Sequence, residues 1–289
     1  MLILFFFLGG IISVLSGFFG VGGGFILTPI LLLIGFSPLE AITTSLFFTI
    51  GTSISGITAH IKLKNIYYKE GLILGLSGVV ATQFARPFVL FLEKKGWDEI
   101  AVPIFYIILL SYFALKMFKQ GKKTTAAEQD GAPSPALYKL VLIGFVGGFV
   151  STTLGVGGGF IMVPLSIAFL GFLPKKAVGT SLFAVMMIVT VGFISYAMTI
   201  SIDYRVGLLL IAGGLIGSQF GAKLTVYFEN KEISTLLAVL YTATLTSVLL
   251  KLFDLSVVGL VLLSIFITYF FVRAITKYRV KKKELRQAS

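Results

Sequence analysis

The residues best suited to chemistry in this chain are two identical glycine-rich segments. Residues 20–24 have the sequence GVGGG, the same five letters recur at residues 155–159, and Phe-Ile follows both copies. Glycine has no side chain and adopts positive φ, so backbone N–H groups in such a segment can approach a ligand closely. Short apolar helices predicted to begin at Phe25 and Phe160 would aim their N-termini at the same point, and helix N-termini bind anions. We therefore expect substrate binding by the last three glycines of each segment: Gly22, Gly23, Gly24, Gly157, Gly158 and Gly159.

Close packing is the alternative explanation for these glycines, because small residues let helix backbones approach each other in a membrane. Two features favour binding over packing alone. The segment occurs twice, and each copy precedes an apolar stretch of about ten residues, which is too short to cross a bilayer.

Hydroxyl and amide side chains occupy matching positions after each glycine segment. Thr44-Ser45 and Thr180-Ser181 lie near the start of the next apolar spans, where such residues donate to a ligand, cap a helix or bond the preceding turn. Gln83 and Gln219 are amides within apolar spans, where they bind a ligand or join two helices. The matched pairs extend the predicted substrate site to Thr44, Ser45, Gln83, Thr180, Ser181 and Gln219.

Ionisable side chains avoid the middle of the apolar spans. The acidic residues fall at span ends or in loops, whereas proton-coupled pumps usually hold a carboxylate at mid-membrane. Arg86 and Lys223 lie nearer the ends of their spans, where long basic side chains extend to the interface or attract an anion. His60 is expected at the interface rather than in a proton relay. With no cysteine and no clustered metal ligands, the sequence predicts no catalytic residue, no metal and no cofactor, which argues against an enzyme.

Composition places these residues in a membrane. Of 289 residues, 57% are hydrophobic and 12% are charged, and the mean hydropathy is +1.01. A soluble protein of this size needs far more polar surface. The net charge of +12 does not indicate nucleic-acid binding, because Lys and Arg cluster in short loops and at the C-terminus between apolar spans.

The likeness between the glycine segments extends into a repeat. Residues 41, 44, 45, 46 and 47 match residues 177, 180, 181, 182 and 183, in one register that holds over roughly seventy residues. We divide the chain into a first membrane repeat (1–118), a polar cytoplasmic linker (119–136), a second membrane repeat (137–250), and an extra transmembrane helix with a basic tail (251–289).

Span lengths and charge define the expected fold. Each half offers three apolar spans of about 20 residues, at 41–60, 70–92 and 98–118 and at 177–200, 205–228 and 232–250. Basic loops stay in the cytoplasm, so the C-terminal tail is assigned there. Counting back from the tail places the two glycine segments in opposite orientations. The prediction is an all-α polytopic bundle of two inverted-topology repeats, each opening with a glycine-broken short or re-entrant helix pair, plus one extra C-terminal helix.

Several of these motifs together resemble the TauE/SafE sulfite exporter family. They are the paired GVGGG-F-I-x-x-P segments, the A-x-x-T-S-L-F motif after each, the HIKLKNI loop at 60–66 and GSQFGAK at 217–223. The resemblance implies a transporter that moves sulfite or small organosulfonates across the cytoplasmic membrane, typically outward. The first half departs from the pattern at residues 85–87 (ARP), where the second has GAK at 221–223, so identical half-sites are not expected.

The resulting functional hypothesis is alternating access around a dehydrated small anion, held near the midplane of the inner membrane. An anion channel remains open, as does a membrane scaffold in which the glycines only pack. The partners expected are the substrate and the lipid bilayer, with a proton or sodium as coupling ion left open and nucleic acid excluded.

Overall fold

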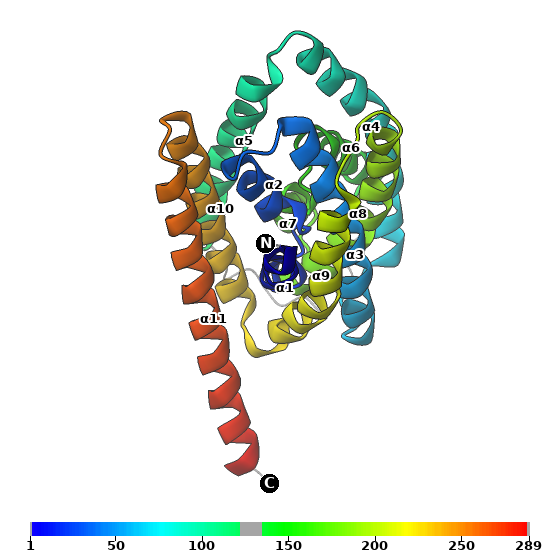
Figure 1. Ribbon diagram of the computed structural model, residues 1–289. Helices are drawn as coiled ribbons and strands as arrows, with labels where there is room; N and C mark the ends of the chain where they lie inside the picture. The colour runs from blue at the N-terminus through cyan, green and yellow to red at the C-terminus, as the bar shows by residue number, and fades with distance from the viewer. Residues whose placement is uncertain (1, 122–134, 288–289) are drawn as a thin grey trace.

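The chain folds as a helical bundle (Figure 1). The computed structural model describes residues 2–121 and 135–287, and every regular element within them is a helix. Most of the predicted linker, 119–136, lies outside these residues. In chain order the helices are α1 (Leu2–Phe19), α2 (Gly24–Leu33), α3 (Pro38–Lys62), α4 (Tyr68–Lys94), α5 (Asp98–Gly121), α6 (Leu137–Leu154), α7 (Gly159–Phe169), α8 (Pro174–Ala197), α9 (Tyr204–Leu224), the 3₁₀ turn η1 (Thr225–Tyr227), α10 (Asn230–Leu252) and α11 (Ser256–Gln287).

The predicted all-α membrane fold is confirmed. Seven helices in the described part of the chain are long and apolar enough to cross a membrane. The helices α2 and α7 have 10 and 11 residues, so each is about 15 Å long and reaches half-way across a hydrocarbon core of about 30 Å. The two short helices are therefore as predicted.

Local sequence explains where the first short helix ends and the next begins. Gly35, with φ +98°, ends the segment after α2 in a conformation that L side chains rarely adopt. Ser37 then caps α3 through a capping box, in which the backbone N–H of Ser37 donates to Glu40 Oε2 at 3.1 Å. Pro38 follows as the first helical residue, where a missing N–H costs nothing.

The two halves exchange packing partners. Helix α1 of the first half packs along α9 of the second, and α6 of the second half packs along α4 of the first. Phe47 on α3 lies against Gly207 and Tyr204 of α9, and at the equivalent place Phe183 on α8 lies against Gly71 and Tyr68 of α4. Each half is thus completed by helices of the other.

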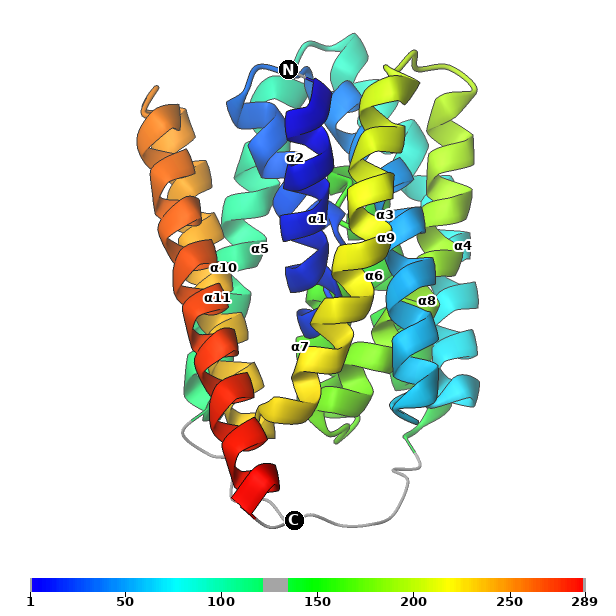
Figure 2. The ribbon, with the colours of Figure 1, turned by 60° about the horizontal axis from the view of Figure 1, so that its bottom comes forward.

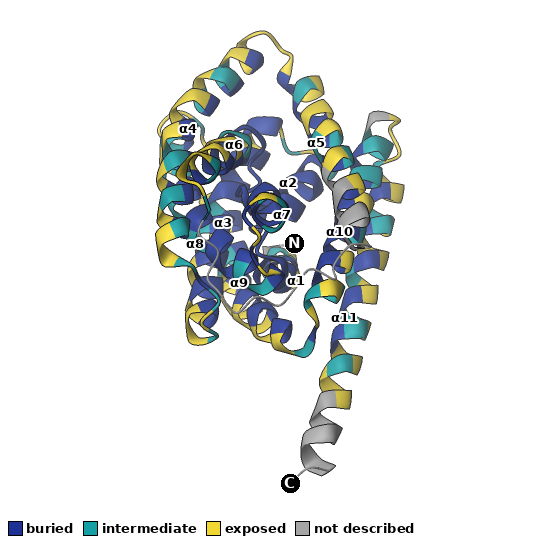
Figure 3. Cartoon of the chain, turned by 180° about the vertical axis from the view of Figure 1, so that it is seen from behind, coloured by how far each residue is buried: buried dark blue, intermediate teal, exposed yellow. Residues whose placement is uncertain are grey.

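The bundle is apolar on its surface and contains hydroxyl groups in its interior. Large hydrophobic side chains such as Ile3, Ile216 and Met198 are among the most exposed of the chain, as is usual for a surface that meets lipid. Buried residues concentrate around the glycine segments and the short helices α2 and α7 (Figure 3). Many buried polar residues are Ser or Thr, and α3 is the richest source of them.

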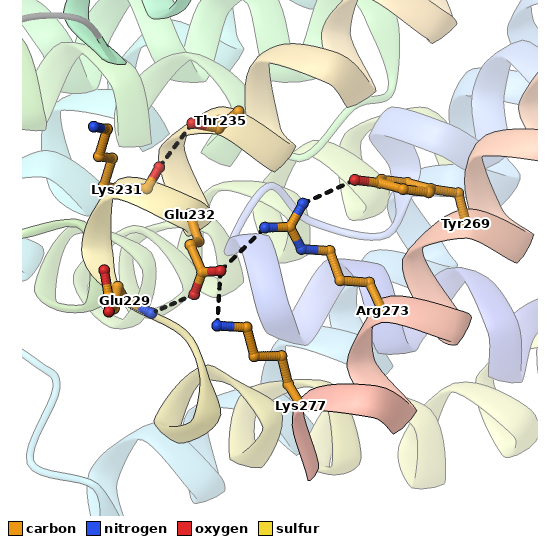
Figure 4. Close-up of polar contacts among 7 residues, drawn as sticks. All are labelled: Glu229, Lys231, Glu232, Thr235, Tyr269, Arg273 and Lys277. Carbon is orange, nitrogen blue, oxygen red and sulfur yellow. Dashed lines mark hydrogen bonds and ion pairs between the residues drawn. The ribbon is translucent and has the colours of Figure 1, made fainter. Parts of the chain in front are cut away.

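Helix α11 is attached to α10 by an ionic cluster at the end where the chain terminates (Figures 2 and 4). Glu232 Oε1 accepts from Arg273 at 3.0 Å and pairs with Lys277 at 2.9 Å. The Arg273 guanidinium also donates to the hydroxyl of Tyr269 at 2.8 Å. Since one carboxylate faces two cations, the cluster holds α11 in place and leaves this end of the bundle positively charged.

Candidate functional site

The two glycine segments meet at the centre of the bundle, and all ten of their residues are buried. Gly24 lies against the Gly155 carbonyl and Gly159 against the Gly20 carbonyl, so closely that a Cβ on either glycine would come within 3.0 Å of that oxygen. Gly22 and Gly157 face each other, and a Cβ on either would lie 3.4 Å from the other's Cα. The pairing confirms one part of the packing explanation, because no larger residue fits at Gly24 or Gly159.

Backbone conformation matches at two pairs of equivalent glycines in the two segments and differs at a third. The φ angles are +68° at Gly20 and +70° at Gly155, and +82° at both Gly22 and Gly157. Gly23, however, has φ −63°, whereas its counterpart Gly158 has φ +73°. Helices α2 and α7 therefore begin differently, and the two half-sites are not identical.

The N-terminus of α2 already has one hydrogen-bond partner within the protein. The backbone N–H of Gly24 donates to Thr49 Oγ1 at 2.8 Å, and that hydroxyl donates to the Ser45 carbonyl at 2.7 Å. The equivalent of Thr49 in the repeat is Val185, which has no hydroxyl. The first half-site thus uses Thr49 to fix the start of its short helix, and this Gly24 donor is not free for a ligand.

We expect Thr49→Val to destabilise the protein, because it leaves the buried Gly24 N–H without a partner while preserving the side chain's volume. An unsatisfied buried donor costs about 1–3 kcal/mol. Thr190→Val on α8 is the matched control, because Thr190 only donates to the Met186 carbonyl of its own helix. The thermal midpoint in detergent should fall clearly further for Thr49→Val, and equal shifts would contradict this role of Thr49.

The predicted hydroxyl residues all lie in the buried region, but two of them hold the protein together. Ser181 Oγ donates to the Gly20 carbonyl at 2.8 Å, and Thr180 Oγ1 accepts from the backbone N–H of Tyr67 at 2.9 Å. Thr44 is buried, and Ser45 is fully buried with no partner for its hydroxyl. Ser45 is therefore a predicted hydroxyl that stands free within this region.

The predicted amides lie elsewhere. Gln83 and Gln219 are both exposed, so the structure does not bring them to the buried glycines. The reason is helical periodicity. On α4 the buried face carries Thr82 and Ala85, and Gln83 points off that face and donates to Thr82 Oγ1 at 3.0 Å. On α9 the buried Ser218 has the exposed Gln219 beside it. We leave both amides out of the site.

The interfacial depth of His60 stays a prediction, but its side chain is enclosed by the protein. His60 is fully buried, and its Nε2 lies 3.0 Å from the Gly17 carbonyl of α1. Although His60 is near the end of α3 in sequence, that turn of the helix faces α1 rather than solvent. Arg86, in contrast, is only half-buried and donates to Thr199 Oγ1 at 3.2 Å, consistent with a place near the span's end.

Sequence reasoning missed the most suggestive polar groups near the glycines. Ser16 and Ser151 are each fully buried, and neither hydroxyl has a hydrogen-bond partner. Their carbonyls accept from Gly20 and Gly155, so each serine lies one turn before its glycine segment. The signal was available, because the two serines have the same spacing as the glycine segments themselves. Further buried hydroxyls without a partner are those of Ser13, Ser53 and Thr152.

Hydroxyl groups lie close to the glycines in both halves. Thr52 Oγ1 is 3.1 Å from the position that a Cβ of Gly23 would take, and Thr28 Oγ1 is 3.1 Å from that of Gly155. In the second half the Ser151 Cβ is 3.1 Å from the corresponding position of Gly158. No cluster of three or more His, Cys, Asp or Glu residues occurs in the described part of the chain. The site is built from neutral donors.

A bundle of apolar spans with two interrupted helices meeting at a buried polar centre is the architecture of a polytopic membrane transporter. Residues 5–248 match the family described as sulfite exporter TauE/SafE, and the chain belongs to that family.

Curated relatives support the same class. The chain is 29% identical to the probable membrane transporter protein YunE of Bacillus subtilis, over 78% of this chain and 89% of the relative. It is also 29% identical to a probable membrane transporter protein of Methanocaldococcus jannaschii, over 80% of this chain and 88% of the relative. No solved structure matches the chain.

Proposed function

We propose that the protein is a secondary transporter that exports a small sulfur-containing oxyanion, sulfite or an organosulfonate, across the cytoplasmic membrane by alternating access. One observation carries the proposal. The two glycine segments meet at a buried point, and one turn before each segment lies a buried serine, Ser16 or Ser151, whose hydroxyl has no partner within the protein. Buried polar groups are nearly always satisfied, so hydroxyls without a partner in the protein are available to donate to a ligand.

The chemistry of the donors favours an oxyanion. Hydroxyl groups and glycine backbone N–H groups donate to oxygen without carrying charge, and hydrogen bonds to a charged acceptor are stronger than neutral ones. Apart from tyrosines, the buried ionisable side chains within the described residues are His60 and Asp98, and Asp98 lies at the start of α5. The family description supplies the sulfur-containing class, which comes to this chain as part of the proposal.

The exchanged packing of the halves supports alternating access. We infer that the halves are inverted repeats, with the C-terminus in the cytoplasm because of its basic tail. In the present conformation the glycine segments are buried, so a substrate reaches this point only after the bundle changes conformation. Rocking one half against the other would open this point to each side in turn.

The experiment that tests this function is counterflow of radiolabelled sulfite in proteoliposomes. We expect label to accumulate transiently when the liposomes are preloaded with unlabelled sulfite. The uptake rate should saturate with sulfite concentration, and taurine-like sulfonates should reduce it if they are substrates. Empty liposomes correct for leak. A current that rises linearly with voltage, together with an absence of counterflow, would favour a channel. An absence of flux for every small sulfur oxyanion would contradict the proposal.

A further inference from the structure

Two adjoining cavities form one apolar groove outside the glycine site. The first, of about 310 Å³, lies between α1 and α9 and reaches Phe271 of α11. The second, of about 440 Å³, lies between the end of α9, η1 and α11. Both are lined by Phe220 and Phe271, so they share a wall. Each volume lies in the range of roughly 300–1,000 Å³ that is typical of small-ligand sites.

The groove follows the axis of α9, which is one of the helices long enough to cross a membrane. Along α9 and η1 it extends from Gly213 to Tyr227, which at 1.5 Å per residue is about 20 Å. One leaflet of the hydrocarbon core is about 15 Å thick. The floor of the groove is formed by Gly10 and Gly217, which carry no side chain, and α1 and α9 are in close contact there. The dimensions suit an extended acyl chain.

One end of the groove is polar and basic. Lys223 lines it, is exposed, and has no ion pair with any residue that the structure describes. Tyr227 and Tyr278 close this end with their rings edge to face at 5.3 Å. Basic side chains outnumber acidic ones around this end, because residues 225–232 and 271–279 carry the basic Lys231, Arg273, Lys277 and Arg279 and the acidic Glu229 and Glu232. The end of α9 lies at the end of the bundle towards which α11 runs to the C-terminus (Figure 2).

We propose that this groove binds an anionic phospholipid of the cytoplasmic leaflet, with its phosphate at Lys223 and an acyl chain along Phe220 and Phe271. Charge complementarity selects this occupant. A neutral apolar helix from a second copy would fill the groove but would leave Lys223 unpaired, whereas a phosphodiester supplies the missing charge. Basic pockets between membrane helices on the cytoplasmic side characteristically hold anionic head groups. Such a lipid would tie the extra helix α11 to the repeat core.

A fluorescent reporter can test the site directly. Trp97, the single tryptophan, is replaced by phenylalanine, and Phe220→Trp places a new indole in the groove wall. The variant is reconstituted in phosphatidylcholine nanodiscs that contain a small fraction of brominated phosphatidylglycerol or of brominated phosphatidylcholine. We expect quenching by the anionic lipid to be at least about five-fold more effective, the factor that one lysine near a membrane surface provides. Leu76→Trp, on the exposed face of α4, reports bulk lipid and should show no such preference.

Two lysine variants complete the experiment. Lys223→Gln should abolish the preference at Phe220→Trp, whereas Lys231→Gln, an exposed lysine at the same end but outside the groove, should preserve it. Equal quenching by the two brominated lipids, or equal effects of the two lysine variants, would overturn the proposal. So would indole emission that depends on protein concentration and not on lipid type, because a second copy would then occupy the groove.

Discussion

Replacing Gly24 with alanine is expected to destabilise the protein strongly. Gly24 opens α2 without a positive φ, so alanine suits its backbone and would by propensity stabilise the helix by about 0.5–1 kcal/mol. The new methyl group, however, would lie within 3.0 Å of the Gly155 carbonyl oxygen, and backbone cannot move aside as a flexible side chain can. Overpacking costs about 1–3 kcal/mol or more. The thermal midpoint should fall by roughly 5–10 °C, or the monodisperse peak should disappear.

Alanine variants of two other glycines separate the effect of close packing from the effect of backbone conformation. Gly10→Ala on α1 meets its nearest atom at 3.6 Å, so it tests a helical glycine with room for a methyl group. Gly35→Ala meets nothing within 4 Å but has φ +98°, so it tests backbone strain alone. Gly159→Ala should match Gly24→Ala, because it makes the reciprocal contact with the Gly20 carbonyl. If Gly24→Ala proved as stable as Gly10→Ala, close packing would not be the reason for this glycine.

Removing the hydroxyls of Ser16 and Ser151 is expected to have the largest effect on transport. If these groups donate to the bound anion, each lost hydrogen bond to a charged acceptor costs about 1.5–3 kcal/mol, or roughly ten-fold or more in affinity. The stability of the substrate-free protein, in contrast, should not fall. Since neither hydroxyl has a partner in the protein, Ser16→Ala and Ser151→Ala should hold or raise the thermal midpoint of the substrate-free protein.

A loss of affinity without a loss of stability distinguishes a serine that binds the substrate from one that stabilises the fold. Ser264→Ala on α11 is the control, because Ser264 is exposed and only donates to the Leu260 carbonyl of its own helix. Its KM for counterflow and its thermal midpoint should both stay near the parent values. Serine variants that lowered stability and left KM unchanged would show that the two hydroxyls serve the fold, and the proposed site would then need to lie elsewhere.

The elements of the fold could be predicted because the bilayer restricts the possibilities. Span length, helical periodicity and the position of charges located the long helices, and the undersized helices were predicted from apolar stretches that end too soon. The meeting of the two glycine segments followed from the repeat. What the repeat could not show is a difference between its copies, such as the opposite φ at Gly23 and Gly158, since the two residues are identical.

The side chains of the site were harder to predict, because a residue's face on a helix depends on which neighbours pack there. Gln83 and Gln219 were chosen for polarity within apolar spans, yet one position along the helix separates each from a buried residue. His60 was judged by its distance from the span's end, whereas its burial depends on α1, which is distant in sequence. Ser16 and Ser151 could have been found from their repeat spacing, but small hydroxyl residues are common in membrane helices and attract little notice.

The exchange of packing partners has a consequence for how the protein is made. Helix α1 is synthesised long before its packing partner α9, which begins at Tyr204. At about 5–20 residues per second, the ribosome needs roughly ten to forty seconds to synthesise the intervening chain. During this interval the glycine-lined face of α1 has only lipid or an insertion factor to cover it. A ribosome stalled after α5 would hold a half-protein that cannot complete itself, and a separately expressed second half would be able to rescue it.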